Sequence, residues 1–446
     1  MRGNAAIRLS EHFTVPRLLR FTFPTVIMLV LTMVYGVADG LFVSNLVGKT
    51  SFAAVNFIMP FLIILGCAGF MFGSGGSALI AKTLGQGNQK RANELFSMVV
   101  YAALLCGILL AAIGLVSVRP VAALMGAEGE LLENSVLYGR VTLLALPFFI
   151  LQYEFQCLFA TAEKPKLGLL ITAAAGLTNV LLDALFVAVF RWGVAGAAAA
   201  TAFSQFVGGT IPLIYFGREN SSTLRLGKWK FDGKALLKAC TNGCSELMSS
   251  VSSALVSMLY NLQLMRLAGE NGVAAYGVLM YVSDIFQAVF LGYAVGVSPV
   301  IGYHFGAQND DEMKSLRRKS TALITAFSVL MFAASQLLAK PLSMIFVGYD
   351  QTLWDMTLYA FRIFSFSFLL TGFSIFGSAF FTALNDGVVS AVISFLRTFV
   401  FRCSMVIALP AIWELDGVWV SVVFAEALAA ITTGLFLIGN QKKYRY

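Results

Sequence analysis

The chain carries little charge for its length. Only 12% of its 446 residues are Asp, Glu, Lys or Arg, whereas a soluble globular protein carries about 25%. Hydrophobic residues make up 58% of the sequence, and the mean hydropathy is +0.81. This composition excludes an ordinary soluble domain and predicts a membrane protein.

Histidine and paired cysteine are also scarce. The sequence has two histidines and six cysteines, and no two cysteines form a CxxC pair. These counts exclude a zinc cluster and a disulfide framework. Residues 74–77 (Ser-Gly-Gly-Ser) resemble a nucleophile elbow only loosely, and neither histidine is near them in sequence. We therefore expect no enzyme, no resident metal and no cofactor.

Apolar runs dominate what the sequence does contain. About 20 apolar residues are enough for a helix to cross a bilayer. Such runs recur twelve times, which predicts an all-α polytopic membrane protein with twelve transmembrane helices near residues 18–44, 52–81, 95–118, 135–160, 166–190, 193–217, 239–267, 273–303, 318–340, 355–383, 388–412 and 416–440.

The basic residues are distributed unevenly between these spans. Loops 218–238 and 314–319 are the richest in Lys and Arg, and they lie on the same side as the N-terminus. Because basic loops stay in the cytoplasm, we predict that both termini are cytoplasmic. The net charge of +8 is then explained by topology and by contact with anionic lipid, so no nucleic-acid partner is expected.

The sequence repeats itself at an offset of 221 residues. Residues 73–80 fall on 294–301, Gly85 falls on Gly306, and Asn88 falls on Asn309. Two homologous membrane halves are typical of transporters that rock one bundle against the other. We predict an N-lobe at 1–217, a cytoplasmic linker at 218–238 and a C-lobe at 239–446.

Two aspartates fall inside predicted spans of the N-terminal half. Asp39 follows Tyr35 by four positions and Asp183 follows Asn179 by four, so each pair shares one helix face. An ionisable residue at a helix centre costs about 2.5–3.5 kcal/mol on insertion scales, which makes each a functional candidate. The repeat does not reproduce this set, because Asp39 maps to Tyr260.

Two facing carboxylates in a low-dielectric lumen cannot both stay ionised without a counter-ion. Either one carries a proton or the two share a cation. Oxygen ligands suit a hard cation such as Na⁺ or a proton. The alternative is structural: Asp39 then lies at a helix end near the outer surface, and Asp183 simply bonds to Asn179.

Other charged residues also fall within spans. Glu246 is a candidate acid of the C-terminal half, or else the partner of a basic residue in the eleventh span. For Glu426 and Arg402 we predict a structural ion pair. Arg397, the other basic residue of the eleventh span, could likewise pair with Asp284, and Glu154 carries no assigned role.

Taken together, these residues resemble the multidrug and toxic compound extrusion (MATE) family over essentially the whole chain. The resemblance rests on Pro24 fifteen residues before Asp39, on 53–56 (Ala-Ala-Val-Asn), and on 85–88 (Gly-Gln-Gly-Asn) with its partner 298–309. Further segments complete the pattern in order: Asn179 to Asp183, then 196–201 with Ser204 and Gln205.

The resemblance implies a V-shaped pair of six-helix lobes in a bacterial or archaeal cytoplasmic membrane. It implies secondary antiport, in which organic cations or amphipathic drugs leave in exchange for H⁺ or Na⁺, by a monomer. Pro24 would be the kink of the first span. The implied coupling set, which would also hold Na⁺ through the first four residues, is Asp39, Asn179, Asp183, Thr201, Tyr35 and Tyr138.

Glu246 matches the seventh-span acid of family members with a C-lobe cation site. The tenth span, however, offers no buried aspartate in its core, which argues against a complete second site. Two other functions are open alternatives. A flippase for lipid-linked saccharide precursors would need a cavity rich in Arg and Lys, and a non-transporting membrane scaffold would not need the aspartate pair.

Overall fold

The computed structural model describes residues 7–42, 46–47 and 49–446, and these residues form helices and their connections without a strand. Residues 43 and 44, the end of the first predicted span, lie outside the described residues. The helices of the N-terminal half are α1 Val15–Phe42, α2 Lys49–Gly66, α3 Ala68–Gly85, α4 Gln89–Leu124, α5 Gly129–Leu144, α6 Leu146–Thr161, α7 Pro165–Asp183, the π-helix η2 Ala184–Val189, and α8 Gly193–Gly217.

The C-terminal half begins with α9, the longest element, and ends close to the last residue. Its helices are α9 Gly233–Gly306, α10 Asp310–Val347, α11 Gln351–Phe364, the 3₁₀ turn η3 Ser365–Ser367, α12 Phe368–Ala383, α13 Gly387–Phe395, the π-helix η4 Leu396–Phe401, α14 Arg402–Ala408, α15 Pro410–Gly439 and α16 Gln441–Tyr444.

The helices supply the predicted spans. Within the described residues, ten helical segments, some of which combine two consecutive helices, are long and apolar enough to cross a membrane. The bent pair Gly129–Leu144 and Leu146–Thr161, counted as one more span, raises the number to eleven. One of the ten, α9, has 74 residues and would be about 110 Å long if straight, far more than a bilayer requires. Division of α9 into two spans gives the twelve expected, and the chain is a polytopic helical membrane protein.

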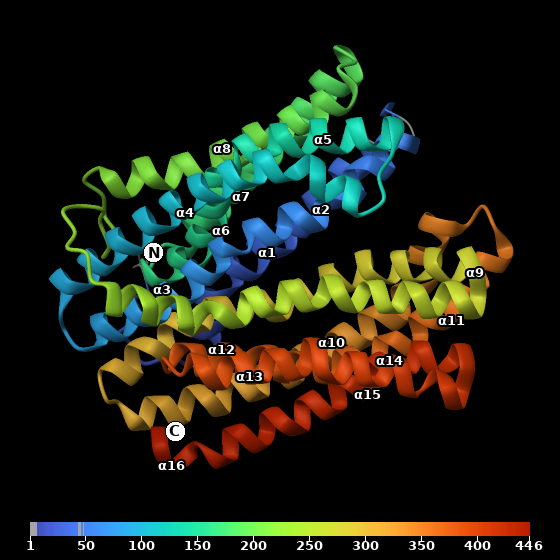
Figure 1. The fold of residues 1–446 in the computed structure, drawn as a ribbon. Coiled ribbons are helices and arrows are strands. Elements are labelled where there is room, and N and C mark those ends of the chain that lie inside the picture. The colour runs from blue at the N-terminus through green and yellow to red at the C-terminus, as the bar shows by residue number, and fades with distance from the viewer. Residues whose placement is uncertain (1–6, 43–45, 48) are drawn as a thin grey trace, which may run out of the picture.

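The division of α9 lies at Gly269, whose φ of 63° and ψ of −151° are not helical. Glycine adopts this left-handed conformation without the steric cost that a Cβ brings. The rings of Tyr260 and Tyr276 stack with centroids 5.0 Å apart across the break. Thus α9 folds back on itself, as the yellow-green and yellow segments of Figure 1 show.

The two halves of the sequence lie on opposite sides of the molecule. In Figure 1, helices α1–α8 lie together above α10–α16, with α9 along the boundary. Both chain ends lie at the same end of the bundle, together with the loop between α8 and α9. We call this end the terminal face.

The halves meet closely near the terminal face. A Cβ on Gly85 would lie 1.9 Å from the carbonyl oxygen of Tyr303, and a Cβ on Gly306 would lie 2.0 Å from that of Lys82. These two contacts are related by the repeat offset. The local structure repeats as well, because Asn88 caps α4 through the Arg91 N–H and Asn309 caps α10 through the Glu312 N–H.

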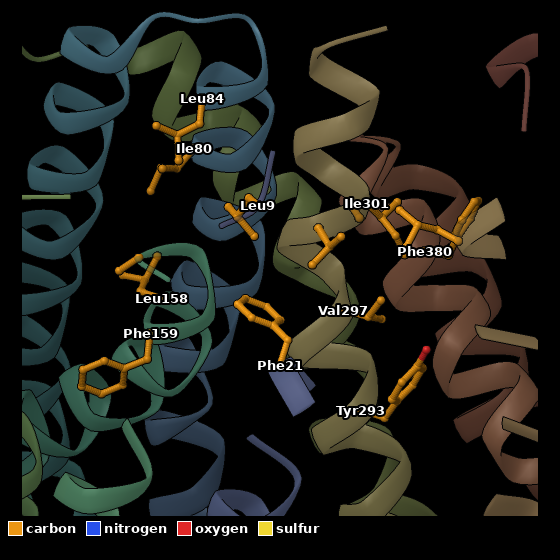
Figure 2. Packing of buried hydrophobic residues seen from close by; sticks show 14 of the residues in the cluster. Leu9, Phe21, Ile80, Leu84, Leu158, Phe159, Tyr293, Val297, Ile301 and Phe380 are labelled. Atoms are coloured by element: carbon orange, nitrogen blue, oxygen red, sulfur yellow. The ribbon is translucent and has the colours of Figure 1, made fainter. Parts of the chain in front are cut away.

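One hydrophobic cluster crosses this boundary. It joins Leu9, Ile80 and Leu158 of the N-terminal half to Val297 and Phe380 of the C-terminal half. Figure 2 shows Leu9 in the centre of this packing. The cluster therefore holds the two halves together in the conformation described.

The segment before α1 is fixed to both halves. The Leu9 N–H donates to Glu163 Oε1 at 2.7 Å, in the turn between α6 and α7. The Phe13 N–H donates to Glu312 Oε1 at 3.0 Å, and His12 Nδ1 lies 2.5 Å from Glu312 Oε2, in α10. Residues 7–14, which we call the N-terminal strap, thus connect the halves across the terminal face.

Candidate functional site

Asp39 and Asp183 come from two helices that pack along each other. Asp39 lies near the end of α1, and Asp183 is the last residue of α7 before the π-helix η2. Their exposed fractions are 6% and 0%. The two carboxyl groups lie within hydrogen-bonding reach of each other, so the structure brings together the pair predicted from the sequence.

Three of the four carboxylate oxygens of this pair have no hydrogen-bond donor among the described residues. Within the described residues, Asp39 Oδ1 and both oxygens of Asp183 accept no hydrogen bond. A buried charge without a partner is strongly unfavourable. A proton on one carboxyl would hydrogen-bond to the other, and a cation between them would satisfy both. The geometry thus fits either a shared proton or a small hard cation.

Tyr35 and Asn179 flank the pair on the same two helices. The Tyr35 ring lies directly on Gly176, where an added Cβ would be 1.9 Å from Cε2. Only glycine allows α1 and α7 to approach so closely here. Asn179 is buried one turn before Asp183. The i, i+4 spacing noted in the sequence therefore directs all four residues to the contact between α1 and α7.

Tyr138 and Thr201 complete the polar group from two other helices. Tyr138 of α5 is fully buried, and its hydroxyl group lies near Thr201 of α8 and near both aspartates. The Thr201 hydroxyl, like that of Tyr138, makes no hydrogen bond within the described part of the chain. Four helices therefore contribute the six residues of the predicted coupling set to one buried polar group.

Pro24 lies in α1 well before this group. The helix continues through it, although proline removes one backbone hydrogen bond. On either side of Pro24, α1 crosses α9 at two glycines: a Cβ on Gly292 would lie 2.5 Å from Val26 Cα, and one on Gly296 would lie 3.1 Å from Thr22 Cβ. The proline therefore lies where α1 meets the C-terminal half.

A second acidic region lies between the halves. Glu246 of α9 is partly buried and lies within electrostatic range of Arg397. Glu154 of α6 is fully buried, and neither of its carboxylate oxygens has a donor in the described residues. Cys157 lies close to both acids. From the sequence, Glu154 is a charged residue within a span and has no assigned role. Only the structure shows that the described residues provide no partner for its carboxylate.

Glu426 forms the predicted structural ion pair. Arg402 Nη2 lies 2.8 Å from Glu426 Oε1, and Arg397 Nε lies 3.0 Å from Oε2. In an α-helix, residues five apart point about 140° away from each other. The π-helix η4 has a wider turn, which brings both arginines to the same carboxylate. The prediction for Glu426 and Arg402 is confirmed, with Arg397 as an additional partner.

Metal ligands of the usual kind do not gather in the described residues. No group of three or more His, Cys, Asp or Glu side chains is arranged to hold a metal ion there. A sodium ion at the polar group would instead use oxygen atoms of mixed type, from Asp39, Asp183, Asn179 and Thr201. Such oxygen donors fit a hard cation.

Comparison with known proteins gives concordant results. The family model described as MatE matches residues 24–185 and 247–409. The chain is 23% identical to the multidrug export protein MepA of Staphylococcus saprophyticus over 94% of its length and 92% of that protein's. It is 24% identical to MepA of Staphylococcus aureus strain MRSA252, with the same coverage.

Solved structures share the fold. A crystal structure of MATE in complex with MaL6 matches with a TM-score of 0.93 at 21% identity, over 99% of this chain and 100% of that chain. An outward-facing conformation of a multidrug resistance MATE family transporter matches with a TM-score of 0.93 at 21% identity, over 100% of both chains. A MOP superfamily transporter from Pyrococcus furiosus matches with a TM-score of 0.91 at 21% identity, again over 100% of both chains.

Proposed function

Because the chain belongs to the MatE family, we propose that it is a secondary active antiporter that exports organic cations or amphipathic drugs in exchange for H⁺ or Na⁺. The multidrug export proteins that the chain resembles support drug-like compounds as the substrate class. The protein acts as a monomer without enzymatic activity or a resident cofactor. Its terminal face lies on the cytoplasmic side of a bacterial or archaeal membrane.

The buried pair of Asp39 and Asp183 is the observation that carries the ion coupling. Two buried carboxyl groups side by side, with no donor for three of their four oxygens among the described residues, favour uptake of a proton or a cation. Occupied and empty states of this group differ in charge and in hydrogen bonding. An ion that binds one conformation more tightly than the other shifts the equilibrium between them by that difference in affinity.

Helix α1 connects the polar group around Asp39 and Asp183 to the boundary between the halves. One end of α1 carries Tyr35 and Asp39, which contact α7. The part around Pro24 contacts Gly292 and Gly296 of α9. A change of charge at Asp39 alters the contact with α7, and the proline provides a weak point at which α1 can bend. Ion binding in one half thereby changes the fit between the halves.

The acids between the halves supply a place for a cationic substrate. Glu154 and Glu246 both lie near Cys157, and the carboxylate of Glu154 has no donor in the described residues. Aromatic rings lie beside this region. Tyr153, the residue before Glu154 in α6, stacks on Phe70 with ring centroids 4.3 Å apart. Carboxylates together with aromatic faces favour an organic cation.

The flippase alternative finds less support. A pyrophosphate substrate would require free basic side chains in the lumen. Arg397 and Arg402, the arginines of the eleventh span, are both bound to Glu426. Their charge is therefore already neutralised in part by a buried carboxylate. The acidic and aromatic lining favours a cation over an anionic lipid precursor.

Transport by the purified protein in proteoliposomes tests this function. We expect uptake of an organic cation dye under an imposed pH gradient or an imposed Na⁺ gradient, and its loss in Asp39→Asn. The matched control is Asp355→Asn, which makes the same chemical change at an exposed position of α11 and should transport like the wild type.

The other outcomes are equally informative. Gradient-driven transport that persists in Asp39→Asn would contradict a coupling site in the N-terminal half and point to Glu246. Wild-type protein that moves no cation under either gradient would contradict antiport. Transfer of a lipid-linked saccharide would then identify a flippase, and failure of both assays would favour a scaffold.

A further inference from the structure

An open pocket lies on the terminal face, away from the polar group of Asp39 and Asp183. Its volume is about 350 Å³. It is formed by the N-terminal strap, by the ends of helices α3, α6 and α9, by the starts of α4 and α7, and by the loop after α8. The side chains used below are Arg8, Gln89, Glu163, Lys164, Ser221 and Tyr303. We call it the linker pocket.

The loop that forms one wall of the pocket is fixed in place. Ser222 Oγ donates to the carbonyl oxygen of Ala162 at 2.9 Å, and the amide of Gln89 donates to the carbonyl oxygen of Thr223. The Arg225 N–H donates to Asn93 Oδ1 at 3.2 Å. These bonds tie the loop to α4 and to the turn after α6. The pocket therefore has a preformed wall before any ligand arrives.

Cationic side chains with unused donors face the pocket. Lys164 donates one of its three N–H bonds to Ser221 Oγ at 3.1 Å, which holds the ammonium group at the rim. The guanidinium group of Arg8 forms no hydrogen bond or ion pair within the described residues. Glu163 lies within electrostatic range of both cations and opposes an anion, but it is one carboxylate against two cations, and its Oε1 already accepts the Leu9 N–H. The local charge is therefore positive.

Two helix N-termini add to this positive character. Helix α4 begins at Gln89, which lines the pocket, and α7 begins at Pro165, directly after Lys164. The N-terminal end of a helix carries roughly half a positive charge and favours anions. An arginine, a lysine, a hydroxyl group and two helix N-termini together are the groups that bind a phosphate.

We propose that the linker pocket binds a phosphate-bearing anion on the terminal face. The phosphate group lies between Arg8 and Lys164, and Ser221 donates to it. Two sources share this chemistry: a free phosphate compound, or the headgroup of an anionic phospholipid such as phosphatidylglycerol. Leu84, which lines the pocket from the end of α3 and is largely buried there, would contact the first carbons of a lipid.

The position of the pocket gives this ligand a conformational effect. Tyr303, from the C-terminal half, belongs to the wall, and its carbonyl oxygen is the group that approaches Gly85. The strap that carries Arg8 is bound to α10 through Glu312. The complete pocket thus exists only while the halves are joined at the terminal face. A ligand that needs the complete pocket stabilises this conformation.

Binding is tested on the full-length protein in detergent, without reference to transport. Inorganic phosphate and dihexanoyl phosphatidylglycerol are titrated separately at constant ionic strength, with dihexanoyl phosphatidylcholine as the zwitterionic control. We expect a saturable rise in Tm with the phosphate-bearing anions. The apparent Kd should be at least about tenfold weaker in Arg8→Gln and Lys164→Met, and near wild type in Lys164→Arg.

Lys166→Met is the matched control. It removes the same charge two residues further along, from an exposed side chain that does not line the pocket, and should bind like the wild type. A rise with phosphate alone, with phosphatidylglycerol alone or with both supports the site and identifies the source. No saturable rise with either compound, or equal weakening in Lys166→Met and Lys164→Met, would overturn the proposal. Arg8→Gln removes no hydrogen bond, so misfolding would not explain its result.

Discussion

The two halves share a fold but treat buried charge in opposite ways. In the N-terminal half, Asp39 and Asp183 lie side by side, and the described residues provide no cationic partner for them. At the repeat offset, Asp39 corresponds to Tyr260, whose hydroxyl lies 2.7 Å from Ser421 Oγ. Thr201 corresponds to Val422, a member of an apolar cluster. The C-terminal half therefore has no acid at these two positions, and the hydroxyl of Tyr260 has a hydrogen-bond partner.

Glu426, the fully buried acid in the described C-terminal half, is paired with arginine and not with a second acid. Glu426 is bound by Arg397 and Arg402. A carboxylate that two guanidinium groups hold stays ionised and structural, whereas a carboxylate beside another carboxylate responds to its ionic surroundings. Pseudo-symmetry of the fold therefore does not extend to the chemistry. One half contains a carboxyl pair for which the described residues provide no donor, and the other contains a carboxylate paired with two arginines.

The largest effect is expected when the N-terminal half is made to resemble the other. Asp183→Ser replaces the acid with the residue found at the offset position, Ser404. Without this carboxyl group, Asp39 has no second acid with which to share a proton or a cation. We therefore expect gradient-driven transport to fall by at least about tenfold, which corresponds to about 1.4 kcal/mol. Rates in proteoliposomes with and without a gradient measure this. Undiminished coupling would show that the pair is structural.

Breaking the ion pair of the C-terminal half should affect stability before transport. Glu426→Gln leaves two buried arginines without their carboxylate, which costs about 3–5 kcal/mol for a pair of this kind. Thermal unfolding in detergent checks the loss. Glu133→Gln breaks a pair with Arg119 that is largely exposed and should cost about 0–1 kcal/mol. Similar losses in the two variants would refute the distinction between the pairs.

The close contact between the halves should be sensitive to one methyl group. Gly85→Ala places a Cβ 1.9 Å from a backbone oxygen, and overpacking of this kind costs about 1–3 kcal/mol. Gly277→Ala is the control, because nothing lies within 4 Å of its Cβ; there, alanine should be neutral or slightly stabilising. A Gly85→Ala protein as stable as the control would mean that the halves separate easily in the resting state.

The smallest effect concerns the two ends of the chain. In each half, an acidic residue in a turn accepts hydrogen bonds from the nearby chain end. Glu163 binds the N-terminal strap, whereas Asp386 accepts hydrogen bonds from Tyr444 and Lys443. Partial burial raises the pKa of Asp386, but the bonds from Tyr444, Lys443 and the Val389 N–H outweigh it and leave the pKa below its usual range.

Because the pKa of this carboxyl group is lowered, the contact stabilises the protein fully at pH values above the ordinary Asp pKa of about 3.9. The stabilisation is lost as the pH falls through the lowered pKa. We expect C-terminal residues to resist carboxypeptidase at neutral pH in the wild type and to become more accessible in Asp386→Asn. Equal digestion of the two proteins at neutral pH would contradict this contact.

The sequence alone predicted the class, the span number and the aspartate pair, because these depend on composition, repeat offset and helical spacing. Asp39 and Asp183 share helix faces with Tyr35 and Asn179, and such spacing is visible in one dimension. The Glu426 and Arg402 pair was also predictable. The role of Arg397 was not, because it depends on the wider turn of η4. Nor was the isolation of Glu154, since the absence of a partner depends on every helix around it.

The reciprocal glycine contacts have the form of an isologous interface. In a symmetric dimer, one residue pair is used twice, and any substitution changes both copies at once. Here, Gly85 with Tyr303 and Gly306 with Lys82 make the same contact in a single covalent chain. Each copy can therefore be altered alone. Because of this independence, one half can contain the Asp39 and Asp183 pair and the other half the Glu426 ion pair, while both glycine contacts between the halves are kept.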